Sequence, residues 1–138
     1  MIDKLILLPK HWQFMREHVA GQVPLEACGM LAGRNSRVER IFPIRNQAQS
    51  PVRFRMDPKE QLDAFEWIDS NGQELLGIFH SHPNGPGEVS ETDIEEAAYP
   101  VVHIVLDGSD GLWSARGFWI ENGKAAEVIL EISHNSNQ

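Results

Sequence analysis

Cysteine is almost absent from this chain, because Cys28 is the only one among 138 residues. A single thiol cannot form an internal disulfide, and it cannot supply a zinc site built from several cysteines. Intracellular proteins are typically free of disulfides, so we expect a cytoplasmic protein. Small buried cysteines are common and nothing gives Cys28 a basic partner, which argues against a nucleophilic role.

Long hydrophobic runs and positive charge are also scarce. Leu5 to Leu8 is among the longest apolar stretches, far short of the ~20 residues that a membrane-spanning helix needs. The first residues lack the basic region and long apolar stretch of a signal peptide. The net charge is −8, whereas nucleic-acid binders gain most of their affinity from Lys and Arg. We therefore expect neither a membrane nor a nucleic acid as a partner.

The length and the hydrophobic content suit a single folded unit. With 138 residues, 41% of them hydrophobic, the chain can bury one core and needs no second domain. We expect a domain over residues 1–132 and a polar, frayed tail over residues 133–138.

The hydrophobic pattern predicts alternating helices and strands in that domain, an α/β (α+β) fold. The stripe Trp12, Met15 and Val19 indicates an amphipathic helix. Asn122-Gly123 is a strong signal for a hairpin turn. We expect strands over residues 5–8, 25–32, 38–44, 52–56, 75–79, 101–106, 112–120 and 126–132.

A second helix is predicted to begin at Asp57. This residue is a typical N-cap, Pro58 suits the first helical position, and Glu60 stands where it would complete a capping box. Leu62, Phe65 and Ile68 are expected to face the core.

The most informative feature is His80-Ser81-His82-Pro83. Residues two apart on a strand project from the same face, so His80 and His82 can converge on one metal ion. On a helix they would point to nearly opposite sides. A bare pair of this spacing arises by chance about once in four chains of this composition, so the pair alone is weak evidence.

Ser90 and Asp93 follow at a spacing that strengthens the hypothesis of a metal site. A helix beginning near Ser90 would place Asp93 in its first turn, close to the loop that leaves the histidines. Adding Pro83, Ser90 and Asp93 at fixed offsets lowers the chance expectation to the order of 10⁻⁴. Two imidazoles, one carboxylate and an open position suit a catalytic Zn²⁺ that activates water. Ser90 to Asp93 is also a plain helix start, and nearby glutamates compete as ligands: Glu88, Glu91 and Glu95.

These residues resemble the JAMM (MPN-plus) metalloprotease motif, and the resemblance spans residues 5–132. Glu26, in Glu26-Ala27-Cys28-Gly29-Met30, resembles the upstream glutamate segment of that family. The resemblance implies a mixed β-sheet flanked by helices, related in architecture to the zinc deaminases. It also implies one Zn²⁺ per chain, with His80, His82 and Asp93 as ligands.

The resemblance further implies that Glu26 is the general acid/base and that Ser90 steadies the tetrahedral intermediate. By itself the sequence favours an ordinary glutamate at a strand edge. Burial of Glu26 at the start of an apolar strand would raise its pKa toward neutrality, which suits proton transfer.

The chain is similar to the single-domain prokaryotic members of the family, because only short connections follow Asp93. We therefore expect a zinc peptidase or isopeptidase acting after the C-terminal Gly-Gly of a ubiquitin-like or sulfur-carrier protein. Two alternatives stay open. One is hydrolysis of a small amide or a cell-wall peptide, and the other is a non-catalytic MPN scaffold that binds partners.

Overall fold

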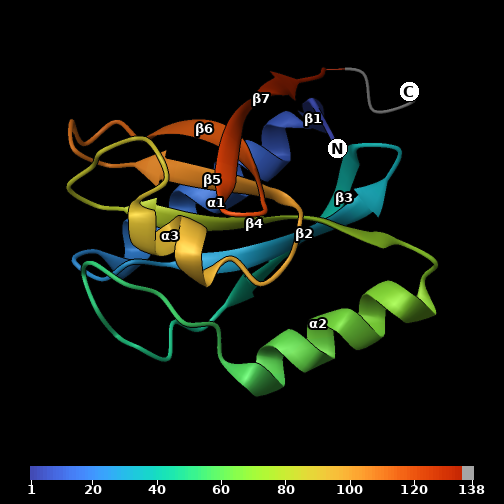
Figure 1. Ribbon diagram of the computed structural model, residues 1–138, viewed down its shortest axis with the longest axis horizontal. Coiled ribbons are helices and arrows are strands. Elements are labelled where there is room, and N and C mark those ends of the chain that lie inside the picture. The colour runs from blue at the N-terminus through green and yellow to red at the C-terminus, as the bar shows by residue number, and fades with distance from the viewer. Residues whose placement is uncertain (135–138) are drawn as a thin grey trace.

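A computed structural model describes residues 1–134 of the chain. Helices and strands alternate along these residues, as the sequence predicts (Figure 1). In chain order they are β1 (Lys4–Leu7), α1 (Pro9–Gln22), β2 (Cys28–Arg34), β3 (Arg37–Ile44), α2 (Pro58–Ser70), β4 (Glu74–His82), α3 (Glu91–Glu96), β5 (Val102–Asp107), β6 (Ser114–Glu121) and β7 (Lys124–Ile132).

The strands form one strongly curved mixed sheet in the order β3-β2-β4-β5-β6-β7-β1. The pairs β4–β5 and β7–β1 are parallel, whereas β2 runs antiparallel to both β3 and β4. A single residue pair, Ile6 with Arg37, brings β1 back to β3, so the sheet curls toward itself. Helices α1 and α2 lie on either side of it (Figure 1). The predicted mixed sheet flanked by helices is confirmed.

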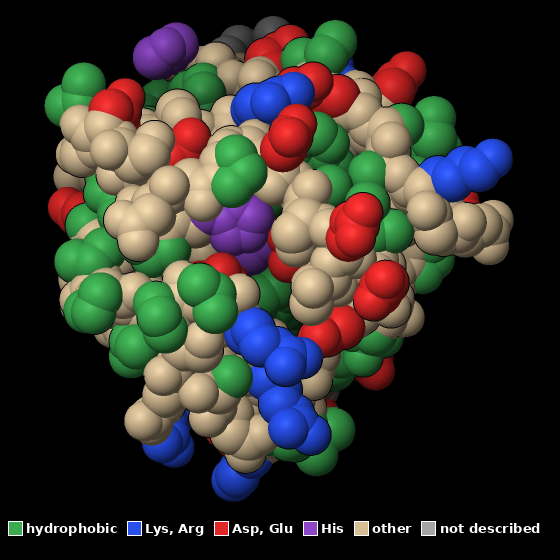
Figure 2. Space-filling view, turned by 60° about the vertical axis from the view of Figure 1, so that its left-hand side comes forward, with side chains coloured by type: hydrophobic (Ala, Val, Ile, Leu, Met, Phe, Trp, Pro, Cys, Tyr) green, Lys and Arg blue, Asp and Glu red, His purple; other side chains and the backbone are tan. Residues whose placement is uncertain are grey.

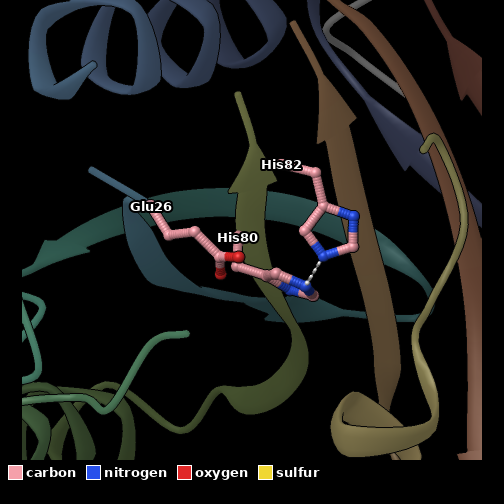
Figure 3. Close-up of side chains that lie close together, drawn as sticks. All are labelled: Glu26, His80 and His82. Carbon is pink, nitrogen blue, oxygen red and sulfur yellow. Dashed lines mark hydrogen bonds between the residues drawn. The ribbon is translucent and has the colours of Figure 1, made fainter. Parts of the chain in front are cut away.

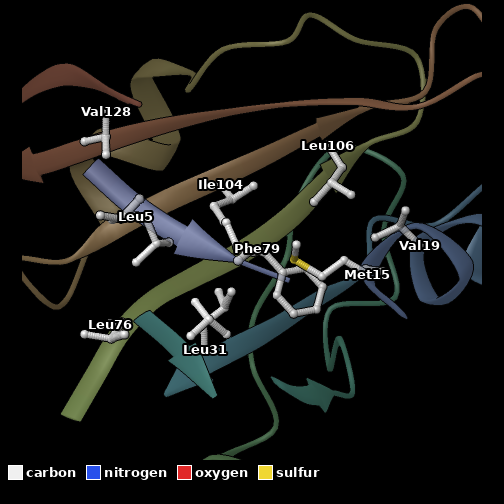
Figure 4. Packing of buried hydrophobic residues seen from close by; sticks show 13 residues of the cluster. Leu5, Met15, Val19, Leu31, Leu76, Phe79, Ile104, Leu106 and Val128 are labelled. Carbon is white, nitrogen blue, oxygen red and sulfur yellow. The ribbon is translucent and has the colours of Figure 1, made fainter. Parts of the chain in front are cut away.

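Strand β2 separates two hydrophobic clusters. Leu31 packs with Met15 and Val19 of α1 and with Phe79 of β4 (Figure 4). On the opposite face, Cys28, Met30 and Ala32 pack with Ala64 and Ile68 of α2. Because successive side chains of a strand point to opposite faces, a strand that is covered on both sides must be apolar throughout. This explains the unbroken apolar run of residues 28–32.

The predicted strand over residues 52–56 is wrong. Only Met56 makes a bridge, with Asn46. The side chain of Asn46 takes the place of a neighbouring strand: its Nδ2 donates to the carbonyl of Arg53, and its Oδ1 accepts from the backbone N–H of Arg55. The segment is therefore a loop, held by this amide side chain and by backbone hydrogen bonds from Gln47 to Arg55 and from Asp57 to Arg45.

Helix α2 begins as predicted, with the Asp57 side chain accepting from the backbone N–H of Glu60. Two details of the prediction are wrong. The Glu60 carboxylate accepts from the backbone N–H of Arg45 instead of completing a capping box. Leu62 is 56% exposed, because at about 100° per residue it lies roughly 120° around the helix from Ile68, outside the buried stripe.

Strand β4 continues to His82, three residues beyond the predicted bound at residue 79, so both histidines lie within the end of the strand. At the hairpin, β6 starts only at Ser114, and Leu112 is exposed. The backbone N–H of Ser133 donates to the carbonyl of Leu7, and residues 135–138 of the predicted tail lie outside the described residues. The proposed boundary at residue 132 stays a prediction. Between residues 1 and 134, no helix is both long and apolar enough to cross a membrane.

Candidate functional site

The two histidines of β4 meet at the end of the sheet, beneath a hollow in the surface (Figures 2 and 3). His80 is fully buried and His82 is 8% exposed. Their Nε2 atoms lie 3.1 Å apart. The prediction that they project from one face of a strand and converge is therefore matched by the geometry.

Helix α3 brings Asp93 to the same point. Its Oδ2 lies 3.1 Å from Nε2 of His80 and 3.3 Å from Nε2 of His82. The same oxygen accepts a 2.9 Å hydrogen bond from the backbone N–H of Ser90, at the start of α3. The hydroxyl of Ser90 in turn accepts from the backbone N–H of Asp93. This reciprocal capping box fixes the rotamer that aims the Asp93 carboxylate at the histidines.

The three atoms fit a metal ion. Ligands at about 2.0–2.1 Å from a tetrahedral zinc lie roughly 3.3 Å from one another, and the three observed separations are 3.1, 3.1 and 3.3 Å. Nδ1 of His82 lies 2.8 Å from the carbonyl of Pro86, which can only accept, so this nitrogen carries the hydrogen. In the neutral ring, the lone pair of Nε2 then faces the site, as metal ligation requires.

The surroundings of these groups shift their pKa values in different directions. Burial lowers the pKa of His80 and keeps its ring neutral. Burial alone would raise the pKa of Asp93, but its close contacts with the two histidines hold it well below its usual range. His82 is buried too, yet its bonds to Asp93 and to Pro86 raise its pKa. An ionised carboxylate beside two imidazoles is a donor set for a divalent cation.

Glu26 lies two residues before β2, the strand that pairs with the histidine-bearing strand β4. One of its carboxylate oxygens and one nitrogen of each histidine all lie within 4.8 Å of one another, and Figure 3 shows the carboxylate turned toward the His80 ring. The side chain is 4% exposed, and its Oε1 has no hydrogen-bond partner among the described residues. Burial, with a smaller contribution from Asp93, raises the pKa of Glu26 to about 7. The expected burial and pKa shift are thus present.

Other sequence candidates lie apart from this group. Glu88, Glu91 and Glu95 are exposed, and Asp93 is the acidic residue of that segment whose oxygen meets the histidines. The thiol of Cys28 is fully buried and donates to the carbonyl of Ile44. Burial raises the pKa of Cys28 to about 12, so it is no nucleophile, in agreement with the prediction.

Sequence reasoning missed three residues that support the site. The Phe54 ring stacks on His80 with centroids 4.5 Å apart. The Asn46 side chain donates to the carbonyl of Glu26 at 2.9 Å. Ser81 points away from the metal face, and its hydroxyl accepts a 2.8 Å bond from the backbone N–H of Ala27. Of these three residues, Ser81 is the one that the sequence could have placed, because strand alternation assigns it to the face opposite the histidines.

The comparison with known proteins agrees with this geometry. The family described as prokaryotic homologs of the JAB domain matches residues 8–120. The chain therefore belongs to this family, and the JAMM resemblance is confirmed.

Individual relatives are similar over most of their length. A desampylase of Pyrococcus furiosus is 36% identical over 130 residues, which are 92% of this chain and 90% of the relative. A probable TtuB-protein conjugate cleaving protease of Thermus thermophilus is 35% identical over 83% of this chain and 75% of its own. Among solved structures, a protein of Desulfitobacterium hafniense superposes with a TM-score of 0.87 at 32% identity, covering 96% of this chain and 95% of the other.

Ser81→Ala should destabilise the protein by about 1–3 kcal/mol, because it leaves the buried N–H of Ala27 without an acceptor. Urea unfolding of the metal-free protein measures this loss. Ser50→Ala is the matched control, since the Ser50 hydroxyl accepts from the backbone N–H of Val52 in an exposed loop. Equal stability of the two variants would contradict a structural role for Ser81.

Proposed function

We propose that this chain is a zinc-dependent peptidase or isopeptidase that cleaves the amide bond after the C-terminal Gly-Gly of a ubiquitin-like or sulfur-carrier protein. One observation carries the catalytic part of the proposal: three ligand atoms converge within 3.3 Å beside a buried glutamate whose pKa lies near neutrality. A scaffold that only binds partners has no need of such a group. The names of the relatives, a desampylase and a TtuB-protein conjugate cleaving protease, support the substrate class.

His80, His82 and Asp93 would hold the ion. Zn²⁺ bound there would polarise the scissile carbonyl and lower the pKa of a water molecule toward neutrality. Nitrogen and oxygen ligands without thiolate also accept other divalent ions, so zinc itself is part of the proposal. The Pro86 carbonyl and the Ser90 backbone keep His82 and Asp93 aimed at the ion.

Glu26 would move the proton. With a pKa of about 7, its carboxylate can accept a proton from the attacking water and deliver it to the leaving amine, and both steps are most efficient when the pKa lies near the working pH. Its free Oε1 has no competing partner among residues 1–134. The Asn46 amide and the Ser81 hydroxyl hold the peptide unit that joins Glu26 to Ala27.

Ser90 would stabilise the oxyanion. Its oxygen already accepts from the backbone N–H of Asp93, but a hydroxyl keeps its hydrogen free to donate. Capping and oxyanion stabilisation are therefore compatible in one residue.

The metal prediction concerns the ligands. Purified protein should carry about one Zn²⁺ per chain, and His80→Ala or Asp93→Ala should lower zinc occupancy and abolish hydrolysis of a Gly-Gly-linked reporter. Elemental analysis measures the zinc. His134→Ala, which changes an exposed histidine, should keep full occupancy. Retention of zinc by the double variant His80→Ala/His82→Ala would refute the ligand assignment.

Glu26→Gln tests the proton carrier. The amide keeps the size of the side chain but cannot accept the proton, so kcat should fall by about 10²-fold or more while zinc stays bound. Glu60→Gln serves as control, because Glu60 lines the same cavity as Glu26 and its carboxylate accepts from the backbone N–H of Arg45. Loss of zinc from Glu26→Gln would instead make Glu26 a ligand.

Ser90 is tested by two substitutions with different forecasts. Ser90→Ala removes a cap, at a cost of about 1 kcal/mol, and also the oxyanion donor, so kcat should fall by roughly 10²-fold. Ser90→Asp restores the cap but offers no donor, so stability should recover while kcat stays low. Melting temperature, zinc content and kcat of the three proteins decide the matter: a zinc-loaded Ser90→Asp enzyme with normal kcat would leave Ser90 as a cap alone.

A further inference from the structure

Positive charge is concentrated in one part of this acidic chain. Residues 34–59 contain seven Lys and Arg against two Asp and Glu, a net charge of +5. The whole chain carries −8, so the remaining residues carry −13. The basic span includes β3 and the loop that leads to α2, and this loop borders the candidate site.

Three arginines of this span, Arg45, Arg53 and Arg55, form what we name the arginine wall. Arg53 and Arg55 line a cavity of about 320 Å³ together with the proposed ligand Asp93. Arg45 lines a second cavity of about 380 Å³ together with Glu26. The arginine wall therefore borders both of these cavities, and Figure 2 shows Lys and Arg side chains gathered beside the hollow that contains histidine.

Two residues of the arginine wall, Arg45 and Arg55, have guanidinium groups that can bind an anionic partner. The Arg53 guanidinium pairs with Glu96 at 2.7 Å. Arg45 and Arg55 are exposed, and within residues 1–134 neither makes an ion pair. The carboxylate of Glu60 accepts from the backbone N–H of Arg45. Unpaired guanidinium groups contribute little to the fold, but beside a cleft they attract anionic groups.

Helix α3, which lines the first of these cavities together with Arg53 and Arg55, carries the opposite charge. Residues 88–96 contain five acidic residues and neither Lys nor Arg. An acidic surface of a partner would be attracted over the arginine wall and repelled over α3. The surface around the site is therefore asymmetric in charge, and this asymmetry can orient a protein substrate before its tail reaches the metal.

We infer that Arg45 and Arg55 dock acidic side chains that stand next to the Gly-Gly tail on the protein substrate. This inference rests on the proposed function and adds the chemistry of the surface that is recognised. Charge pairs at the rim of an interface act mainly on association, so the arginines should act on kcat/KM for a protein substrate, with an effect that salt screens.

The test compares two reporters: a short neutral peptide and an acidic ubiquitin-like sulfur carrier, each with the same fluorophore joined by an amide after Gly-Gly. The measured quantity is the ratio of kcat/KM for the carrier to kcat/KM for the peptide. Arg45→Glu/Arg55→Glu should lower this ratio by about tenfold at low salt, and most of the loss should disappear at about 0.5 M NaCl. Arg45→Lys/Arg55→Lys should keep it within about twofold, because the charge remains.

The matched control is Lys10→Glu/Lys124→Glu, which makes the same change in net charge at two exposed lysines. Lys124 begins β7 and pairs with Glu121, at the end of the sheet away from the histidines. The control should keep the ratio. An unchanged ratio in the arginine variant, or an equal fall in the control, would overturn the docking inference.

Binding separates this inference from the proposed function. If the wild-type protein cleaves neither reporter, the proposed function fails, and calorimetric titration of the Glu26→Gln protein with the acidic carrier still decides on docking. Binding that weakens about tenfold on adding Arg45→Glu/Arg55→Glu supports the arginine wall. Equal binding by both proteins, or none by either, refutes it.

Discussion

The shared carboxylate oxygen of Asp93 is the interaction on which this site depends. Two imidazoles buried at the end of a strand lose their contact with water, and neutral nitrogens without a partner are costly there. The Asp93 oxygen meets both Nε2 atoms, and it is itself held by the backbone of Ser90. The first turn of the six-residue helix α3 thereby fixes the position of an acidic group relative to β4, the strand that precedes it in the chain.

The neighbouring strand supplies the second half of the site. Because β2 pairs with β4 with Cys28 opposite His80, the residue that precedes β2 by two positions arrives beside the histidines. The buried carboxylate of Glu26 then shares their low-polarity surroundings, which raise its pKa, while the ionised Asp93 keeps its charge through hydrogen bonds. Two carboxylates beside the same pair of histidines thus acquire different protonation, one suited to holding a cation and the other to carrying a proton.

Much of this could be predicted from the sequence, because the determining signals are local. Strand periodicity places His80 and His82 on one face, and the cap signature of Ser90 places Asp93 in a first turn. The sequence could not reveal the support from Asn46 and Phe54, since both lie in a loop whose shape depends on a side-chain amide acting as a strand partner. The prediction of a strand over residues 52–56 failed for the same reason, because the shape of this loop depends on contacts with Asn46. The exposure of Leu62 depends on which face of α2 meets the sheet, which is a tertiary property.

The irregular pairing of β2 with β4 has a consequence for how this fold can vary. The register shifts between Leu31 and Ala32, so one residue of β4, Leu76, is passed over, while the pairing from Gly77 to His80 is regular. A slip of one residue at the regular end would exchange both imidazoles for the hydroxyl of Ser81, because alternate residues of a strand face opposite sides. This β-bulge lies at the end of β4 that is remote from the histidines. An insertion or deletion at that end can therefore be tolerated without turning His80 and His82 away from the site.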